Sequence, residues 1–415
     1  MDHTSEKNLI QFKSINDSLI SGYPVVPIIN LGFHGFADSF YPPELAEQAR
    51  ESAPLICCLD KTTGLVQLKN LTVAADRYNL VDYSYTSSNS IIAQEHWNNF
   101  FKAVLAKLGT NTENILEIGS NDGYLLSLFK NFGHIVLGVD ASQAMVTRAN
   151  LKGIRTIQGI FGESTISTSE INKHSENFSL IIANNVINHS NNPINFVKEV
   201  ASYLNEDGTF IFEVPYWYST ISSLRFDQIY LEHITYFTVE SLEHLLKTAN
   251  LYINDVELVD YHGGSLRVYS SFKNAYSSNK DKFINLEATL NLKEEKTYIN
   301  YVKKINQNKD IFLKNLENFQ SLHPTRLVFG IGAAAKSNTL LTYYGLDTKK
   351  INFIVDSSPF KQGKITPVTC IPIKKDEILL DIKSGLGVIL AWNLSKTLKE
   401  KILNINSNID FLDLN

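Results

Sequence analysis

Short apolar runs alternate with segments of helical periodicity between residues 112 and 215. Strands that are separated by helices run parallel, because each helix carries the chain back across the sheet. The alternation therefore predicts an α/β fold with a doubly wound, Rossmann-like sheet. The predicted strands are NILEIG (114–119), HIVLGVD (134–140), SLIIANNVINH (179–189) and TFIFEVPYW (209–217).

The first strand leads into a loop that predicts a cofactor site. Gly119 and Gly123 lie on this strand-to-helix turn, where the missing β-carbon lets a ligand approach the backbone. Asp140 ends the next strand, a position at which a carboxylate accepts both hydroxyls of a ribose. NAD-like dinucleotides and S-adenosylmethionine both use this layout.

The residues of the loop favour S-adenosylmethionine over NAD. The dinucleotide fingerprint needs three glycines and places a pyrophosphate at the helix N-terminus, where Asp122 would repel it. Glu117 and Asp122 instead suit a ligand with a positively charged sulfonium. A Rossmann-like domain with a vacant loop is the alternative that needs no ligand.

Polar residues at the end of the third strand extend the predicted site. Ligands of open α/β sheets bind beyond the carboxyl ends of the strands, where Asn184, Asn185 and His189 fall. The asparagines are placed to contact the adenosine or methionyl part of the cofactor. The predicted cofactor-binding residues are Glu117, Gly119, Asn121, Gly123, Asp140, Ala141, Asn184 and Asn185.

The stretch FDQIYLEHITYF (226–237) groups a phenol, a carboxylate and an imidazole within an apolar segment. Tyr230, Glu232 and His233 are suited to acid–base chemistry, and a histidine with an ordinary pKa near 6.5 accepts a proton at neutral pH. The alternative is a half-buried element with amphipathic aromatic residues, which is the interpretation we adopt for Tyr236.

The remainder of the chain predicts two further units. Residues 1–80 contain short β-prone pieces broken by YPP and TTG, which indicates a small irregular β domain. Residues 81–275 hold the predicted Rossmann-like sheet, preceded by a helix over 89–108. Residues 276–415 begin with a charged helical connector and continue, from Arg326, as a second Rossmann-like α/β unit.

Composition excludes several classes of protein. A formal net charge of −5 without a long basic run argues against nucleic-acid binding. The sequence has neither a secretory signal pattern nor an apolar stretch of the roughly 18 residues that span a membrane. Three cysteines cannot build a disulfide framework, so we expect a reduced, cytoplasmic protein.

The ordered motifs together resemble the sugar C-methyltransferases that act on nucleotide-linked 4-keto-6-deoxyhexoses. The resemblance spans nearly the whole chain. It is carried by GLVQL (64–68), DYSYTSS (82–88), EIGSNDGYLL (117–126), GVDAS (138–142), ANNVINH (183–189), FEVPYW (212–217), FDQIYLEHITYF, HGGSLRVY (262–269), GIGAAAKSNTLL (330–341), VDSSPFKQGKITP (355–367) and IPI (371–373). It implies three domains: a small zinc-binding domain, a class I methyltransferase domain and a Rossmann-like C-terminal domain.

The chain departs from this family at the zinc site. The family has two Cys-x-x-Cys pairs, whereas Cys57 and Cys58 are adjacent here and the first pair is missing. Two neighbouring thiols and the distant His34 make a poor tetrahedral site. We therefore expect no structural zinc.

The resemblance implies methylation of carbon 3, next to the ketone, in branched deoxysugar biosynthesis. The ketone acidifies the hydrogen on carbon 3, so the reaction needs a base, donors for the enolate oxygen and the methyl donor in line. His233 is the implied base, Glu232 and Tyr230 contact the sugar or the enolate, and His189 completes the donor set. A tyrosine of DYSYTSS joins them; we favour Tyr83 over Tyr85.

Further residues are predicted to bind the substrate. The glycine pair in HGGSLR either borders the sugar pocket or forms a tight turn, and the loop of the C-terminal unit either holds the nucleotide pyrophosphate or is structural. The predicted substrate-binding residues are Tyr85, His262, Gly263, Gly264, Lys336 and Asn338. An O- or N-methyltransferase and a non-catalytic homologue are the alternatives; the nucleotide and the choice between monomer and homodimer stay open.

Overall fold

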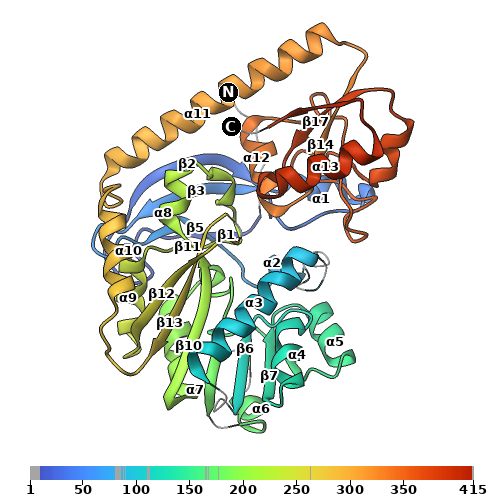
Figure 1. Ribbon diagram of the computed structural model, residues 1–415. Coiled ribbons are helices and arrows are strands. Elements are labelled where there is room, and N and C mark those ends of the chain that lie inside the picture. Colours follow the sequence, from blue (N-terminus) through green and yellow to red (C-terminus); the bar gives the residue numbers. More distant parts are fainter. Residues whose placement is uncertain are drawn as a thin grey trace.

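The computed structural model describes residues 10–79, 86, 88, 90–109, 113–163, 166, 168–175, 177–261 and 263–413 (Figure 1). Tyr83, Tyr85 and His262, three of the predicted site residues, lie outside the described residues.

The central unit is a seven-stranded sheet in the order β12-β13-β10-β9-β6-β7-β8. The five strands from β10 to β8 are parallel, and β13 runs antiparallel to both β10 and β12. Strand order reverses between β6 and β9, so a crevice forms there at the carboxyl ends of the strands. The strands are β6 (Asn114–Ile118), β7 (Ile135–Asp140), β8 (Thr156–Gln158), β9 (Phe178–Ile182), β10 (Leu204–Pro215), β12 (Tyr252–Val259) and β13 (Ser265–Ser271).

Helices cover both faces of this sheet, which confirms the predicted Rossmann-like class (Figure 1). Local capping sets where they begin: the Ser90 hydroxyl accepts from the Ala93 N–H at the start of α3, and the Asn192 side chain accepts from the Asn195 N–H at the start of α7. The helices are α3 (Ile91–Leu108), α4 (Tyr124–Asn131), α5 (Gln143–Leu151), α6 (Thr168–Asn172), α7 (Pro193–Tyr203), α8 (Trp217–Ser222) and α9 (Val239–Lys247).

The N-terminal region forms a four-stranded sheet in the order β11-β4-β3-β2. Its outer strand β11 (Thr235–Tyr236) comes from the polar segment 226–237 and pairs with β4, so this sheet holds one end of that segment. The other strands are β2 (Val26–His34), β3 (Ala53–Leu59) and β4 (Val66–Leu68), beside a ribbon of β1 (Phe12–Ser14) and β5 (Asn70–Thr72) and the short helices α1 (Ala46–Ala49) and α2 (Asp76–Asn79).

Cys57 and Cys58 lie on β3 and are buried. His34 Nε2 donates to the Leu31 carbonyl at 3.0 Å, and burial lowers the pKa of this imidazole to about 4. No group of three or more histidine, cysteine or acidic residues in the described part of the chain is arranged to hold a metal ion.

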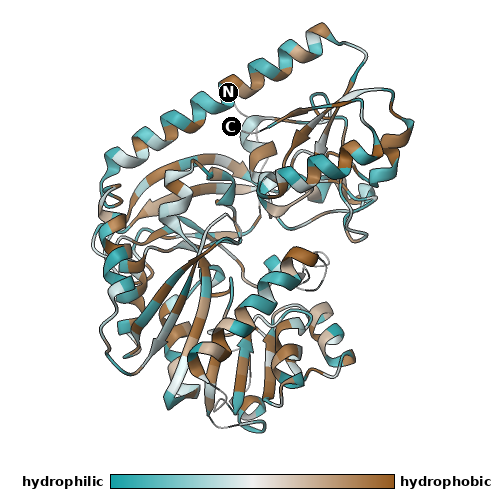
Figure 2. Ribbon diagram, viewed as in Figure 1, coloured by the Kyte–Doolittle hydropathy of each residue, from teal (hydrophilic) through white to brown (hydrophobic). Residues whose placement is uncertain are grey.

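A long amphipathic helix connects the central unit to the C-terminal unit. Helix α10 (Ser278–Ala288) leads into α11 (Glu295–Leu322), which runs along the outside of the N-terminal sheet (Figure 1). Figure 2 shows apolar and polar residues alternating along α11, and Tyr298, Ile305 and Phe312 are buried at helical spacing. No helix among the described residues is long and apolar enough to cross a membrane.

The C-terminal unit is a five-stranded parallel sheet in the order β16-β15-β14-β17-β18. Its strand order reverses between β14 and β17, which places a second crevice at the carboxyl ends of these strands. The elements are β14 (Leu327–Ile331), α12 (Ala335–Tyr344), β15 (Phe353–Val355), β16 (Ile373–Lys374), β17 (Gly385–Ile389), α13 (Ser395–Ile405) and β18 (Ile409–Leu412).

Candidate active site

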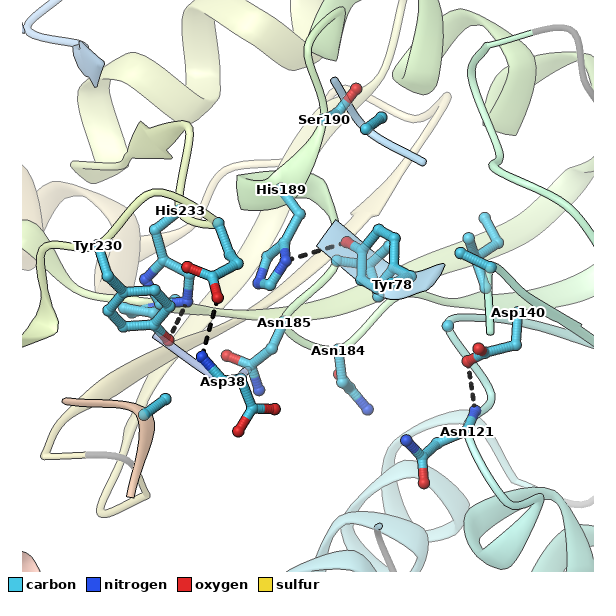
Figure 3. Close-up of a pocket in the computed structure, with 18 of the residues that line it drawn as sticks. Asp38, Tyr78, Asn121, Asp140, Asn184, Asn185, His189, Ser190, Tyr230 and His233 are labelled. Atoms are coloured by element: carbon cyan, nitrogen blue, oxygen red, sulfur yellow. Dashed lines mark hydrogen bonds between the residues drawn. The ribbon is translucent and has the colours of Figure 1, made fainter. Parts of the chain in front are cut away.

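A cavity of about 360 Å³ joins the two crevices. The loops after β6, β7 and β9 line one end, the polar segment around Tyr230 lines the middle, and the loops after β14, β15 and β17 line the other end. Figure 3 shows side chains from these elements around one space. A ligand at the glycine loop and a second ligand that reaches the C-terminal unit can therefore meet at the polar segment.

The glycine loop is held against the next strand by Asp140. One carboxylate oxygen accepts from the Asn121 N–H and the other from the Ser142 N–H, each at 2.8 Å. Burial raises the pKa of this carboxyl to about 6. At Gly119 the backbone φ is 71°, and a β-carbon would lie 2.3 Å from Val186 Cγ2, so this position requires glycine.

Two buried polar atoms at this end are left for a ligand. Glu117 Oε2 and Asn184 Nδ2 have no hydrogen-bond partner within the described residues, although both residues line the cavity. Burial, followed by the charges of Asp140 and Asp122, raises the pKa of Glu117 well above its usual range. A ligand with hydroxyl, amine and cationic groups satisfies these atoms, and S-adenosylmethionine has all three.

The polar segment places Tyr230 and His233 in direct contact. The Tyr230 hydroxyl lies 2.5 Å from His233 Nε2, and the two rings are 3.8 Å apart between centroids. The Tyr230 N–H donates to the Tyr236 hydroxyl at 3.2 Å. Tyr236 is buried in the core beside Trp217 and does not line the cavity. Its hydroxyl therefore fixes the backbone of Tyr230 on the side away from the cavity.

Glu232 faces the cavity between the N-terminal region and His233. One oxygen accepts from the Asp38 N–H at 2.9 Å, and Oε2 is buried without a hydrogen bond in the described structure. Burial raises the pKa of Glu232 to about 7, against the opposing effect of the backbone donors at Asp38 and Ala37. A carboxyl with this pKa can accept or donate at neutral pH.

His189 is held from two sides. Its Nδ1 lies 3.1 Å from the Tyr78 hydroxyl, and its carbonyl accepts from Arg77 Nη1 at 2.6 Å. Its ring is 4.9 Å from the His233 ring between centroids. Burial, and then the charge of Arg77, lowers the pKa of His189 to about 3, so this imidazole is neutral across the physiological range.

Two lysines line the far end of the cavity. Lys336 lies in the first turn of α12, with Nζ 4.3 Å from the centre of the Trp392 ring, and burial lowers its pKa to about 8. Lys361 Nζ donates to the Ala333 carbonyl at 2.7 Å. The cavity thus runs from a carboxylate-rich end to an end with two amines.

Two family models cover most of the chain. Residues 93–256 match the model described as a methyltransferase domain, and residues 260–409 match the C-methyltransferase C-terminal domain. The chain is 29% identical over 315 residues to the C-methyltransferase NovU of Streptomyces niveus, which is 75% of this chain and 74% of NovU. The chain therefore combines a methyltransferase domain with the C-terminal domain of C-methyltransferases.

Two of the similar solved structures each match less than half of this methyltransferase. The PH0226 protein of Pyrococcus horikoshii OT3 is 18% identical and matches 47% of this chain and 98% of its own, with a TM-score of 0.38. An S-adenosylmethionine-dependent methyltransferase of Clostridium acetobutylicum ATCC 824 is 17% identical and matches 44% and 92%, with a TM-score of 0.36.

The methyltransferase brings most of its sequence-predicted residues to one cavity. The lining includes Glu117, Gly119, Asn121, Asp140, Ala141, Asn184, Asn185, His189, Tyr230, Glu232, His233 and Lys336. Gly123, Gly263, Gly264 and Asn338 are not among the lining residues. Gly123 and Gly263 instead allow close packing, because a β-carbon would lie 3.0 Å from Ile154 and 2.5 Å from Trp392, respectively.

The side chain of Asp122 does not point into the cofactor end of the cavity, as expected from its place in the loop, but toward another segment. Its carboxylate does not line the cavity, and it pairs with the Lys152 ammonium at 2.8 Å and accepts from the Ser88 hydroxyl. Its charge still acts on the cofactor end through space, since after burial it contributes to the raised pKa of Glu117 and of Asp140. Sequence spacing shows that an acid lies in the loop, but not which way its side chain points.

Sequence reasoning missed several lining residues of the methyltransferase, among them Asp38, Tyr78 and Lys361. Each lies far along the chain from the segment that it joins; Tyr78, for example, reaches His189 across 111 residues. Lys361 falls within VDSSPFKQGKITP (355–367), a motif that carries the family resemblance, but it was assigned no role. Asp38 and Tyr78 lie outside those motifs, and the tyrosine next to Arg77 was a weak signal.

Proposed function

We propose that this methyltransferase transfers a methyl group to carbon 3 of a nucleotide-linked 4-keto-6-deoxyhexose, in the biosynthesis of a branched deoxysugar. The observation that carries the proposal is the continuous cavity, in which Tyr230 and His233 lie between the cofactor loops and two lysines. The similarity to the C-methyltransferase NovU supports transfer to carbon.

His233 is the proposed base. The imidazole removes the proton from carbon 3, and the electron pair of the broken C–H bond moves into the ketone to give an enolate. S-adenosylmethionine supplies a methyl group on a positively charged sulfur. Bound at the end that Glu117 and Asp140 line, it would give this methyl group to carbon 3 as the carbon–sulfur bond breaks, and the enolate would return to the ketone.

The neighbouring side chains stabilise the enolate. Tyr230 shares a hydrogen bond with His233, so its hydroxyl is in reach of the same part of the substrate. His189 is neutral and therefore serves as a hydrogen-bond donor or a support, not as a cation. Glu232 contacts a sugar hydroxyl, and Tyr83 completes this set in the proposal, with Tyr85 as the alternative substrate contact.

The lysine end suits the nucleotide diphosphate. Lys336 stands at the N-terminus of α12, where backbone N–H groups and the helix dipole also favour an anion, and Lys361 approaches from the loop after β15. In this proposal residues 1–80, 81–275 and 276–415 are three domains, and each supplies part of the cavity wall.

Product analysis tests the proposal directly. The enzyme is incubated with S-adenosylmethionine carrying a ¹³C-methyl group and a panel of dTDP-, UDP-, GDP- and CDP-linked 4-keto sugars, and the product is examined by NMR. A methyl resonance coupled to carbon 3 is expected. A methyl group on oxygen or nitrogen, or transfer to a sugar that lacks the ketone, would favour an O- or N-methyltransferase instead.

A further inference from the structure

Helix α12 is bonded to the backbone of the polar segment and to the backbone of the N-terminal region. Asn338 Nδ2 donates to the Ala37 carbonyl at 2.6 Å, and the Thr339 hydroxyl donates to the Ile229 carbonyl at 3.0 Å. Both donors are buried, with 3% and 1% of their surface exposed. Asn338 was predicted to bind substrate; the structure gives its side chain this backbone contact instead.

The two carbonyls adjoin the groups proposed to do the chemistry. Ile229 directly precedes Tyr230, whose hydroxyl contacts His233. Ala37 directly precedes Asp38, whose N–H donates to Glu232. A shift of α12 would therefore be transmitted to the tyrosine–histidine pair through one hydrogen bond and to the glutamate through the other.

A second connection reaches the start of the polar segment. The Trp392 indole N–H donates to the buried Asp227 carboxylate, and the Trp392 ring lies against two cations, with the Arg225 guanidinium carbon at 3.9 Å and Lys336 Nζ at 4.3 Å from its centre. Asp227 precedes Gln228, which lines the cavity. Cation–π contacts of this kind stabilise the arrangement of the loops that carry them.

The same helix begins at the lysine end of the cavity. Lys336 lines the cavity, while Asn338 and Thr339, two and three residues further on, hold the backbone of the site. An α-helix is stiff over so short a span, so an anion bound at its first turn and the groups held by its second turn are fixed relative to each other.

We propose that Thr339 and Asn338 are positioning residues for the methylation: α12 holds the Tyr230–His233 pair and Glu232 in register with a substrate whose anionic group is bound at Lys336. This inference rests on the proposed function. It gives the C-terminal unit a role in turnover as well as in substrate binding, because loss of these bonds misplaces the base without removing any group that touches the substrate.

Exchange and turnover kinetics of α12 variants test the inference. Thr339→Val keeps the shape of the side chain and removes its hydroxyl; we expect kcat, and the rate of deuterium exchange at carbon 3 in D₂O, to fall about tenfold, with the KM for both substrates within about twofold. Thr339→Ser should restore most of the rate. Thr342→Val, the same change at a half-buried position three residues along α12, leaves the bond to Ile229 intact and should behave as the wild type.

The outcomes separate the inference from the function on which it rests. Two results would overturn the inference alone. In the first, the wild type exchanges deuterium and Thr339→Val exchanges and turns over at the same rate. In the second, Thr339→Val loses thermal stability but keeps its kcat per folded enzyme. A rate in Asn338→Ala that equals the wild-type rate removes the second bond from the proposal. Absence of exchange and of methylation in the wild type with every 4-keto sugar nucleotide overturns the proposed function, and this inference with it.

Discussion

Replacing Asp140 by asparagine should separate cofactor binding from folding. The carboxylate accepts two backbone N–H groups, from Asn121 and Ser142, and lines the cofactor end of the cavity. An asparagine keeps one acceptor oxygen and turns the other into an N–H₂ group, so one backbone N–H then faces a donor. The variant also loses an acceptor for the ribose hydroxyls.

The magnitude follows from these contacts. A hydrogen bond to a charged group contributes about 1.5–3 kcal/mol, which corresponds to a roughly 10- to 150-fold weaker Kd for S-adenosylmethionine. Calorimetric titration with S-adenosylmethionine or S-adenosylhomocysteine measures the change. Because burial raises the pKa of Asp140 to about 6 and the ribose is accepted by the ionised form, wild-type affinity should also fall as the pH drops through about 6, and Asp140→Asn should lack this dependence.

The C-terminal unit offers a matched control. Asp356 directly follows β15, much as Asp140 ends β7, and its two oxygens accept from the Ala333 N–H at 2.7 Å and the Ser358 N–H at 2.8 Å. It does not line the cavity. Asp356→Asn should lower stability by a similar amount and leave the Kd for S-adenosylmethionine within about twofold. Equal weakening in both variants, or unchanged affinity in Asp140→Asn, would refute the assignment.

Three further changes test other parts of the molecule. Burial raises the pKa of Glu232 to about 7 from an ordinary 4.5, so the native state binds this proton more tightly and the free energy of unfolding of the wild type falls as the pH rises from about 4.5 to 7. The Tm of Glu232→Gln should therefore rise relative to the Tm of the wild type between pH 5 and 8, while its methylation rate falls about 100-fold. Lys336→Met should weaken binding of a nucleoside diphosphate about tenfold in calorimetry and leave S-adenosylmethionine affinity unchanged, and equal affinity for the diphosphate would remove this lysine from the substrate site. Glu287 is buried and accepts from the Val239 N–H at 2.6 Å at the start of α9, so Glu287→Ala should lower the free energy of unfolding by about 1–2 kcal/mol in urea titration without changing cofactor affinity.

The parts of the fold that could be predicted are those with strong local periodicity. Strands β6, β7 and β10 and helices α3, α4 and α7 were predicted because each carries an apolar pattern of its own length. β8 and β16 were missed, since strands of three and two residues contain too little periodicity. The pairing of β11 with β4 joins segments about 170 residues apart and depends on packing that no local pattern encodes.

The residues of the candidate site likewise divide into those that a local pattern predicts and those that it does not. Glu117, Gly119 and Asp140 were found because a strand end and a glycine turn place them along the chain, and the ends of parallel strands meet at one edge. The directions of the Asp122 and Asn338 side chains could not be predicted, because each is set by a partner from another segment, Lys152 in one case and the Ala37 carbonyl in the other.

Deuterium exchange at carbon 3 is the most direct test of the account. The wild-type enzyme is incubated in D₂O with a nucleotide-linked 4-keto-6-deoxyhexose and S-adenosylhomocysteine, and exchange is followed by NMR in parallel with His233→Asn. The account predicts deuterium at carbon 3 with the wild type and a loss of at least about 100-fold in the variant. Exchange at an equal rate in His233→Asn would contradict the assignment of this imidazole as the base.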